Sequence, residues 1–272
     1  MYNTSESKQV FFEQLTKMTK KKTPEKIQYK KNFLTDVIFR VDFPIILDIA
    51  ENTPKEFQNK IMNDFPTLEP IQQFGVRIEK KDLDINTFPA NKTTWRFLSS
   101  NKNYLIELDS EFLAVVCKKY DNFTDFKKTV FKILKSFVHL YPKLVINRLG
   151  LRYINQIQLE EADFFIWQSY LNKSLITNLD FFENKNDLRR AMQVYEITLE
   201  DEVNINFKCG IFNSSFPAPI NKKEFTLDYD CYTRTQLPSD QVIDKLTKFN
   251  EIIGKYFERS ITNKLREVLN NG

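Results

Sequence analysis

Glycine, histidine and cysteine are all scarce in this 272-residue chain, and each shortage excludes a class of chemistry. Loops that cradle phosphates need closely spaced glycines, because backbone N–H groups must approach the anion without a Cβ in the way. The five glycines are far apart in the sequence: Gly75, Gly150, Gly210, Gly254 and Gly272. The chain therefore contains neither a P-loop nor a dinucleotide-binding fingerprint.

The single histidine, His139, excludes a metal site built from several histidines. It falls within residues 123–141, where apolar residues recur at helical spacing. Lys132 and Lys135 share its face of this predicted helix. We therefore expect His139 to be exposed to solvent and to have no catalytic role.

Cysteine usage and the lack of long apolar runs indicate a cytosolic protein. The three cysteines match neither a zinc motif nor a disulfide framework, and we expect each to be a small buried apolar side chain: Cys117, Cys209 and Cys231. The longest apolar run covers only residues 112–117, whereas a spanning helix needs about 20 residues. Residues 1–7 are polar and lack the apolar core of a signal peptide. We predict no transmembrane segment and no cofactor.

Charge is unevenly distributed along the chain. Residues 1–31 hold eight lysines and three acids, a net charge of +5, whereas the remainder carries −1. Val10, Phe11, Leu15 and Met18 recur at helical spacing, which predicts a short amphipathic helix within this basic arm. Its candidate contact residues are Phe11, Leu15, Lys20, Lys21 and Lys22. The arm has three interpretations: packing on its own body or on a second copy, docking to another protein, or contact with nucleic acid or an anionic membrane.

The rest of the chain predicts strands and helices in a near-repeating order. For residues 32–142 we expect a strand at 32–43, a helix at 53–64, strands near 71–80, 93–99, 104–108 and 112–118, and a helix at 123–141. For residues 143–272 we expect a strand at 144–159, a helix at 163–172, strands at 189–199, 202–212 and 223–234, and helices at 238–257 and 261–269.

This order predicts an α+β fold, with an antiparallel sheet and long helices on one face. The sheet would consist of two similar halves of the β-α-β4-α type, at residues 32–142 and 143–272, after the arm at 1–31. In outline the expected fold is similar to the TATA-binding-protein or helix-grip arrangement. The likeness rests on the order of the elements, because side-chain identity between the halves is weak.

Period-two alternation assigns a set of polar residues to one face of the predicted sheet. These candidate binding residues are Arg40, Arg148, Arg152, Asn204, Asn206, Lys208, Asp228 and Asp230. A face that binds phosphates should be mostly positive, but this set mixes both signs. The interpretations are mutual ion pairing, a recognition surface for a protein or small ligand, and catalysis.

Two acidic patterns are candidates for metal-dependent hydrolysis. Asp64 followed by Glu79-Lys80-Lys81 resembles the acid and acid-x-lysine arrangement of metal-dependent nucleases. Similar Glu-x-Lys triplets recur elsewhere, so we interpret the motif as a solvated strand end. Asp228 and Asp230 alternate on a strand, which is typical of a solvated face, and we predict no metal ligands.

Three stretches resemble a known family. They are Trp95–Ser100 leading into Tyr104–Leu108, then Arg148–Asn155, and finally Phe257–Arg266. Together they resemble an uncharacterised, sporadically distributed prokaryotic family of similar length, over about residues 32–269. The family usually has a proline just before its first strand, where this chain has Asn32, and the basic arm is an addition to it. The resemblance implies no catalytic residues, but it implies an association with mobile-element, toxin–antitoxin or phage-defence genes.

The sequence favours a non-enzymatic binding or adaptor protein with a protein partner, possessing a polar sheet face and a basic arm. The alternatives are a nucleic-acid-binding protein, a metal-dependent hydrolase using Asp228, Asp230 or Glu79, and a carrier of an apolar ligand. The last is motivated by 25 phenylalanines in a helix-grip-like fold. A homo-oligomer is a further expectation consistent with the arm.

Overall fold

The computed structural model describes residues 29–78 and 85–271, with side chains described outside residues 72–92. The candidate arm residues Phe11, Leu15, Lys20, Lys21 and Lys22 therefore lie outside the described residues, as do the amphipathic helix and the Glu79-Lys80-Lys81 motif. Within the described part of the chain, no helix is long and apolar enough to cross a membrane.

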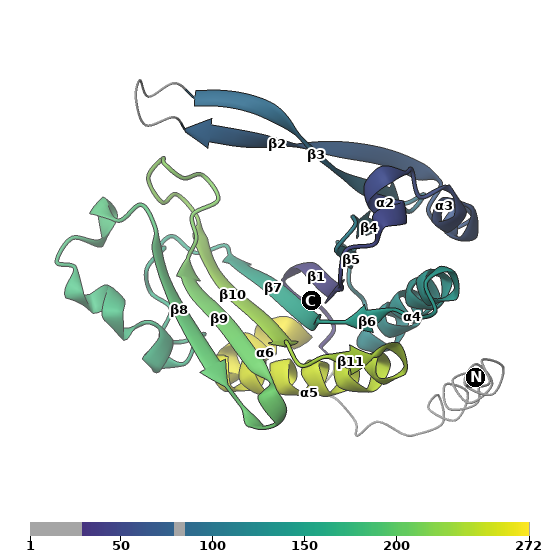
Figure 1. The fold of residues 1–272 in the computed structure, drawn as a ribbon. Coiled ribbons are helices and arrows are strands. Elements are labelled where there is room, and N and C mark those ends of the chain that lie inside the picture. The colour runs from purple at the N-terminus through teal and green to yellow at the C-terminus, as the bar shows by residue number, and fades with distance from the viewer. Residues whose placement is uncertain (1–28, 79–84, 272) are drawn as a thin grey trace.

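A nine-stranded antiparallel sheet dominates the described residues (Figure 1). Its spatial order is β2 (Thr67–Ile78), β3 (Ile85–Leu98), β4 (Tyr104–Leu108), β5 (Phe112–Cys117), β1 (Leu34–Asp42), β7 (Arg148–Leu159), β10 (Lys223–Thr233), β9 (Asn204–Ile211) and β8 (Ala191–Thr198). A small second sheet pairs β6 (Val145–Ile146) with β11 (Leu237–Pro238). The predicted antiparallel sheet is confirmed.

The two central strands show why these sequences form strands. Val37, Phe39 and Val41 alternate along β1 and are completely buried. In the β1–β7 register, Phe39 lies opposite Leu151 and Val41 lies opposite Leu149, so the apolar faces of both strands coincide. Paired residues project to the same side of a sheet, so the polar residues between them share the other face.

Helices cover the apolar face of the sheet. The α-helices are α2 (Leu47–Glu51), α3 (Lys55–Ile61), α4 (Phe123–Leu140), α5 (Val242–Ser260) and α6 (Asn263–Asn270). The apolar stripe of α4, including Phe126, Val130 and Phe137, is buried in the core. Leu246 and Phe249 of α5 are buried in the same core, and α5 packs on β7 and β10. Figure 1 shows α5 and α6 on one side of the strands β7 to β10. The expected long helices on one face are therefore present.

The residues that are rare in this sequence lie where the pattern predicted. Cys117, Cys209 and Cys231 are buried free thiols, and burial raises the pKa of both Cys209 and Cys231 to about 12. His139 is exposed near the end of α4. These side chains therefore have structural or solvent-facing positions, as expected.

The helix predicted at residues 163–172 is wrong. The buried side chains Trp167 and Leu171 mimic helical spacing, but the chain there forms turns. The Asp163 carboxylate accepts hydrogen bonds from two backbone amides that follow it, at 2.9 and 3.2 Å. Further along, the amide of Asn172 donates to the carbonyl of Ser260, the last residue of α5, at 2.8 Å. Bonds to a distant element therefore replace the local ladder of a helix.

Three short 3-10 helices fill the rest of this connection, namely η1 (Lys173–Leu175), η2 (Thr177–Phe181) and η3 (Lys185–Asp187). The expected β-α-β order at the start of the second half is therefore incorrect. The strand predicted at 144–159 is also divided, because the Asn147 amide bonds to the carbonyl of Asp42 between β6 and β7.

Candidate recognition surface

The structure brings all eight polar candidate residues together on four neighbouring strands. We call this set the polar sheet face: Arg40 on β1, Arg148 and Arg152 on β7, Asp228 and Asp230 on β10, and Asn204, Asn206 and Lys208 on β9. The register places Arg152 opposite Asp230, which in turn lies opposite Asn206. Arg40 and Asp228, which are 188 positions apart in sequence, thereby lie on the same surface with only β7 between their strands.

The ion pair of Arg152 with Asp228 contains the most buried carboxylate of the polar sheet face. The Asp228 carboxylate accepts two parallel hydrogen bonds, from Arg152 Nε at 2.8 Å and from Nη2 at 2.7 Å. The side chain of Asp228 is only 8% exposed, so most of its solvation comes from this guanidinium. These hydrogen bonds raise the pKa of Arg152. A bidentate ion pair of this kind fixes the orientation of both side chains.

Arg148 holds the second acid of β10. Its Nη2 lies 3.1 Å from Asp230 Oδ2, and its guanidinium lies 4.9 Å from the centre of the Tyr232 ring. Burial raises the pKa of Asp230, while the positive charges of Arg148 and Arg152 oppose that rise. The Asp230 carboxylate is thus held in a partly desolvated position between two arginines.

Arg40 also has an acidic partner on its own strand. Arg40 Nε lies 2.6 Å from Asp42 Oδ1, and the guanidinium stacks over Phe112 at 4.0 Å from the ring centre. Asp36, nearby on β1, forms an ion pair with Lys118. All three arginines of the polar sheet face are therefore neutralised by aspartates.

The β9 residues add neutral and positive groups to this surface. Asn204 Oδ1 accepts a hydrogen bond from the hydroxyl of Thr198 at 2.9 Å, and Asn206 donates to Glu196 at 3.4 Å. Among the residues that the structure describes, Lys208 forms no ion pair, and its positive charge opposes the rise in the pKa of the nearby Asp230. With the neighbouring acids Asp42 and Glu196 included, this surface holds four basic and four acidic side chains and is close to charge balance.

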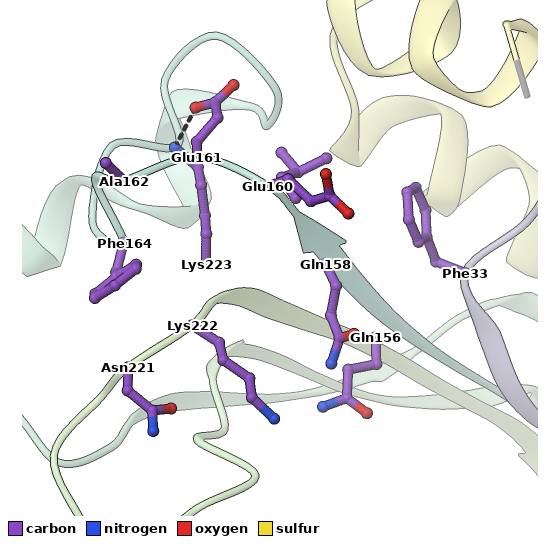
Figure 2. Close-up of a pocket in the computed structure, with 11 residues that line it drawn as sticks. Phe33, Gln156, Gln158, Glu160, Glu161, Ala162, Phe164, Asn221, Lys222 and Lys223 are labelled. Carbon is purple, nitrogen blue, oxygen red and sulfur yellow. Dashed lines mark hydrogen bonds and ion pairs between the residues drawn. The ribbon is translucent and has the colours of Figure 1, made fainter.

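A cleft of about 720 Å³ adjoins the polar sheet face at the end of β7. It is lined by Phe33, Gln156, Gln158, Leu159, Glu160, Glu161, Ala162, Phe164, Asn221, Lys222 and Lys223. Figure 2 shows the amide ends of Gln156, Gln158 and Asn221 and the ammonium end of Lys222 directed to the same side. Gln156 also donates to Glu224 at 3.1 Å. The cleft thus continues the polar surface along β7.

Period-two alternation along β7 places Gln156 and Gln158 on the same face as Arg148 and Arg152, but the sequence pattern did not identify a cleft. It missed Glu160, Asn221 and Lys222, which lie in the connections that flank β7 and β10. The only sequence feature that could have identified these three residues is their position at the ends of two predicted strands, which the structure places side by side. Loops that meet in this way are common places for binding residues.

A buried lysine forms one wall of the cleft. The side chain of Lys223 is completely buried, and its Nζ lies 2.8 Å from Glu161 Oε2 and 2.6 Å from the carbonyl oxygen of Ile166. The same Nζ lies 5.3 Å from the centre of the Trp167 ring. Hydrogen bonds from Lys223 and Tyr170 lower the pKa of Glu161. Because the ammonium group is already paired, this wall supports the cleft and leaves recognition to the exposed groups.

The geometry does not assemble the residues named for metal-dependent hydrolysis. Among residues 29–78 and 85–271, no group of three or more His, Cys, Asp or Glu is placed to hold a metal ion. Asp228 and Asp230 are each engaged by an arginine, and Asp64 pairs with Lys132 of α4. Glu79 lies outside the described residues. The described groups instead form a set of fixed hydrogen-bond donors and acceptors, with charged side chains of both signs.

No protein-family model matches the chain, and no curated protein matches it. The resemblance carried by the motifs at 95–108, 148–155 and 257–266 therefore stays a hypothesis. The case for function rests on the polar sheet face, the adjoining cleft and the basic arm.

Proposed function

We propose that this protein is a non-enzymatic binding or adaptor protein that recognises another protein. The polar sheet face and the adjoining cleft form the recognition surface, and the basic arm supplies a second contact. The observation that carries the proposal is the pairing of Arg40, Arg148 and Arg152 with aspartates, which leaves a surface close to charge balance. Protein surfaces present donors, acceptors and charges of both signs, and such a surface complements them.

Charge balance favours a protein over nucleic acid as the partner of the sheet. Affinity for nucleic acid comes largely from lysine and arginine groups that neutralise phosphates. Arginines that are held by carboxylates would first have to leave those partners. Contact with nucleic acid is therefore a competing outcome that rests mainly on the arm, with its net charge of +5.

The family resemblance supports a cellular setting for this adaptor. We place the protein in the cytoplasm of a prokaryote, as an accessory component of a mobile defence or toxin–antitoxin type of system. The support for this setting is the association that the resemblance implies. The reduced state of the three buried cysteines is compatible with it.

We also propose that the sheet consists of two related halves, with an outline similar to the TATA-binding-protein or helix-grip arrangement. The support is the strand order on either side of the centre. From the edge of the sheet to its centre, the strands of one half are β2, β3, β4, β5 and β1, and those of the other half are β8, β9, β10 and β7. In each half, the strand that comes first in sequence among these lies at the centre of the sheet. The strands that follow it in sequence are placed in order from the edge towards the centre.

Affinity capture of the tagged full-length protein from its native host tests the adaptor proposal. The informative variant combines Gln158→Lys with Lys222→Glu, because both side chains line the cleft and are exposed. The matched control is Lys255→Glu, which makes the same charge reversal at an exposed position on α5. A third variant changes Lys20, Lys21 and Lys22 to Gln to test the arm.

We expect one protein to be captured in a stoichiometric ratio by the wild-type chain and by Lys255→Glu. Its binding should weaken about tenfold or more with the cleft variant, as for changes at the centre of an interface. A partner retained equally by the cleft variant would contradict recognition at this surface. Recovery of nucleic acid alone, with affinity that falls steeply with salt, would replace the proposal with nucleic-acid binding.

A further inference from the structure

An exposed arginine lies over two half-exposed phenyl rings where β8 begins and β9 ends. The guanidinium carbon of Arg190 is 4.6 Å from the ring centre of Phe212 and 4.1 Å from that of Phe216. Arg190 Nε also donates to the backbone carbonyl of Phe212 at 2.8 Å. Phe212 is 45% exposed and Phe216 is 50% exposed. We call these three residues the arginine–aromatic site.

A buried asparagine holds the arginine–aromatic site together. Asn213 is only 2% exposed, and its Nδ2 donates to the carbonyls of Arg189 and Ala218, at 2.8 Å each. Its own backbone carbonyl accepts a hydrogen bond from the amide of Phe216 at 3.0 Å. Asn213 has a φ of +58°, in the left-handed region that asparagine adopts more readily than most residues. One side chain therefore ties the backbone before Arg190 to the turn that carries Phe216.

A buried carboxylate fixes the same connection between β9 and β10, at residues 212–222. Glu224 accepts hydrogen bonds from the backbone amide of Ser214 and from its hydroxyl, the latter at 3.0 Å. The connection ends at Asn221 and Lys222, which line the cleft. The arginine–aromatic site is thus continuous with the proposed recognition surface. Groups that are fixed before a partner arrives lose less conformational entropy on binding.

The outer edge of the Arg190 guanidinium has unused donors. Among the residues whose side chains the structure describes, neither Nη atom of Arg190 has a hydrogen-bond or ion-pair partner. In contrast, each arginine of the polar sheet face is paired with an aspartate. The edge formed by Nη1 and Nη2 matches the two oxygens of a carboxylate. The exposed phenyl rings beside it provide apolar surface for a neighbouring aromatic group.

We propose that the arginine–aromatic site binds an acidic side chain of the partner protein that stands next to an aromatic residue in the partner's sequence. The carboxylate accepts hydrogen bonds from Nη1 and Nη2 of Arg190, and the aromatic ring packs on Phe212 and Phe216. The inference rests on the proposed function for the class of partner, a protein. Phosphate is a poorer match, because residues 180–190 hold three acids beside three basic residues, whereas a phosphate site should be mostly positive.

Nuclear magnetic resonance titration of the full chain with two dipeptides tests this inference. The probes are N-acetyl-aspartyl-phenylalaninamide and its asparaginyl counterpart, which has nearly the same shape but no charge. We expect the aspartyl probe to shift the Arg190 Nε–H signal and the Phe216 amide signal, with a dissociation constant in the millimolar range. The asparaginyl probe should bind about tenfold more weakly, because it cannot form the charge-assisted pair.

Variants assign the response to particular side chains. Arg190→Gln should abolish the shift of the Phe216 amide, and Phe216→Ala should weaken binding several-fold at the Arg190 signal. Arg234→Gln is the matched control, because Arg234 is also exposed and lies 5.7 Å from the centre of the Tyr232 ring. It removes the same charge and should leave the response at Phe216 unchanged.

The comparison of the two probes on the wild-type chain does not depend on how any variant folds. Equal binding of the two probes, no shift with either, or an aspartyl response that persists in Arg190→Gln would overturn the inference. So would tighter binding of a short oligothymidylate at the same signals, which would assign the site to nucleic acid. Because the probes report on this site without the partner, a negative titration leaves capture through the cleft to be judged by its own experiment.

Discussion

At the scale of single residues, burial decides how much each ion pair of the polar sheet face stabilises the fold. The Asp228 side chain is 8% exposed, whereas that of Asp42 is 28% exposed. A carboxylate that has lost its water depends on its guanidinium partner, while an exposed carboxylate can be hydrated instead. Arg152 therefore stabilises the fold more than Arg40 does, although both lie at similar distances from their carboxylate partners.

Arg152→Ala should lower the free energy of unfolding by about 2 kcal/mol, because it leaves the Asp228 carboxylate buried without a partner. Arg40→Ala, the matched truncation, should cost less than about 1 kcal/mol. Urea denaturation of both variants at neutral pH measures the difference. Equal losses for the two variants would show that burial of Asp228 does not control the energetics of this surface.

A double variant separates the ion pair from the packing around it. Arg152→Leu combined with Asp228→Leu removes both charges and should be more stable than Arg152→Ala alone, since no unpaired charge remains. A double variant that is less stable than Arg152→Ala would assign the loss to packing of the arginine stem.

At the scale of secondary-structure elements, local periodicity succeeds where an element packs as one unit. The strand predicted at 104–108 coincides with β4, and the helix predicted at 123–141 coincides with α4 to within one residue. Prediction fails where tertiary bonds replace local ones, as at residues 163–172. It also fails for β3, which begins at Ile85, because Pro89 and Asn91 favour a connection rather than a strand.

The pairing of β8 with β9 depends on a glycine that the sequence pattern does not reveal. Gly210 has a φ of +140°, and a Cβ there would lie 2.0 Å from the carbonyl oxygen of Ala191, the first residue of β8. Gly210→Ala should therefore displace the start of β8 and cost about 3 kcal/mol. Hydrogen exchange of the β8 amides measures the displacement directly.

The same substitution at Gly254 is a matched control. Gly254 lies inside α5, where alanine is favoured over glycine by about 1 kcal/mol. Gly254→Ala should leave the hydrogen exchange of the β8 amides unchanged. Normal protection of β8 in Gly210→Ala would show that the edge strand can form without this close approach.

At the scale of the whole molecule, one sheet joins the two predicted halves. Strand β1 belongs to residues 32–142 and β7 belongs to residues 143–272, yet they pair at the centre of the sheet. The buried apolar residues of both halves belong to one cluster. Neither half can therefore lose its sheet without exposing the edge and the core of the other.

We expect the chain to unfold in a single cooperative transition. Its two tryptophans allow a direct measurement, since Trp95 lies on β3 in the first half and Trp167 lies in the second half. Trp95→Phe leaves a reporter of the second half, and Trp167→Phe leaves a reporter of the first. In each variant, the fluorescence midpoint in urea should coincide with the midpoint from far-ultraviolet circular dichroism. Separate midpoints would show that the halves unfold independently.

The sequence by itself determined the class of fold and the composition of the polar sheet face. Alternation along a strand assigns each side chain to a face without reference to any other strand, so Arg152 and Asp228 could be placed on the open face from local pattern alone. Tyr229 and Phe207 alternate with the polar residues of β10 and β9, and their rings stack on the opposite face with centres 4.6 Å apart.

Only the tertiary structure decided which of these residues meet. The pairing of Arg152 with Asp228, the cleft beside Gln158 and Lys222, and the position of β8 at the edge of the sheet all depend on the order and register of strands that are distant in sequence. Period-two alternation carries no information about which strands are neighbours or how they are aligned. That information comes from burying the whole apolar surface at once, which is a property of the folded chain rather than of any segment.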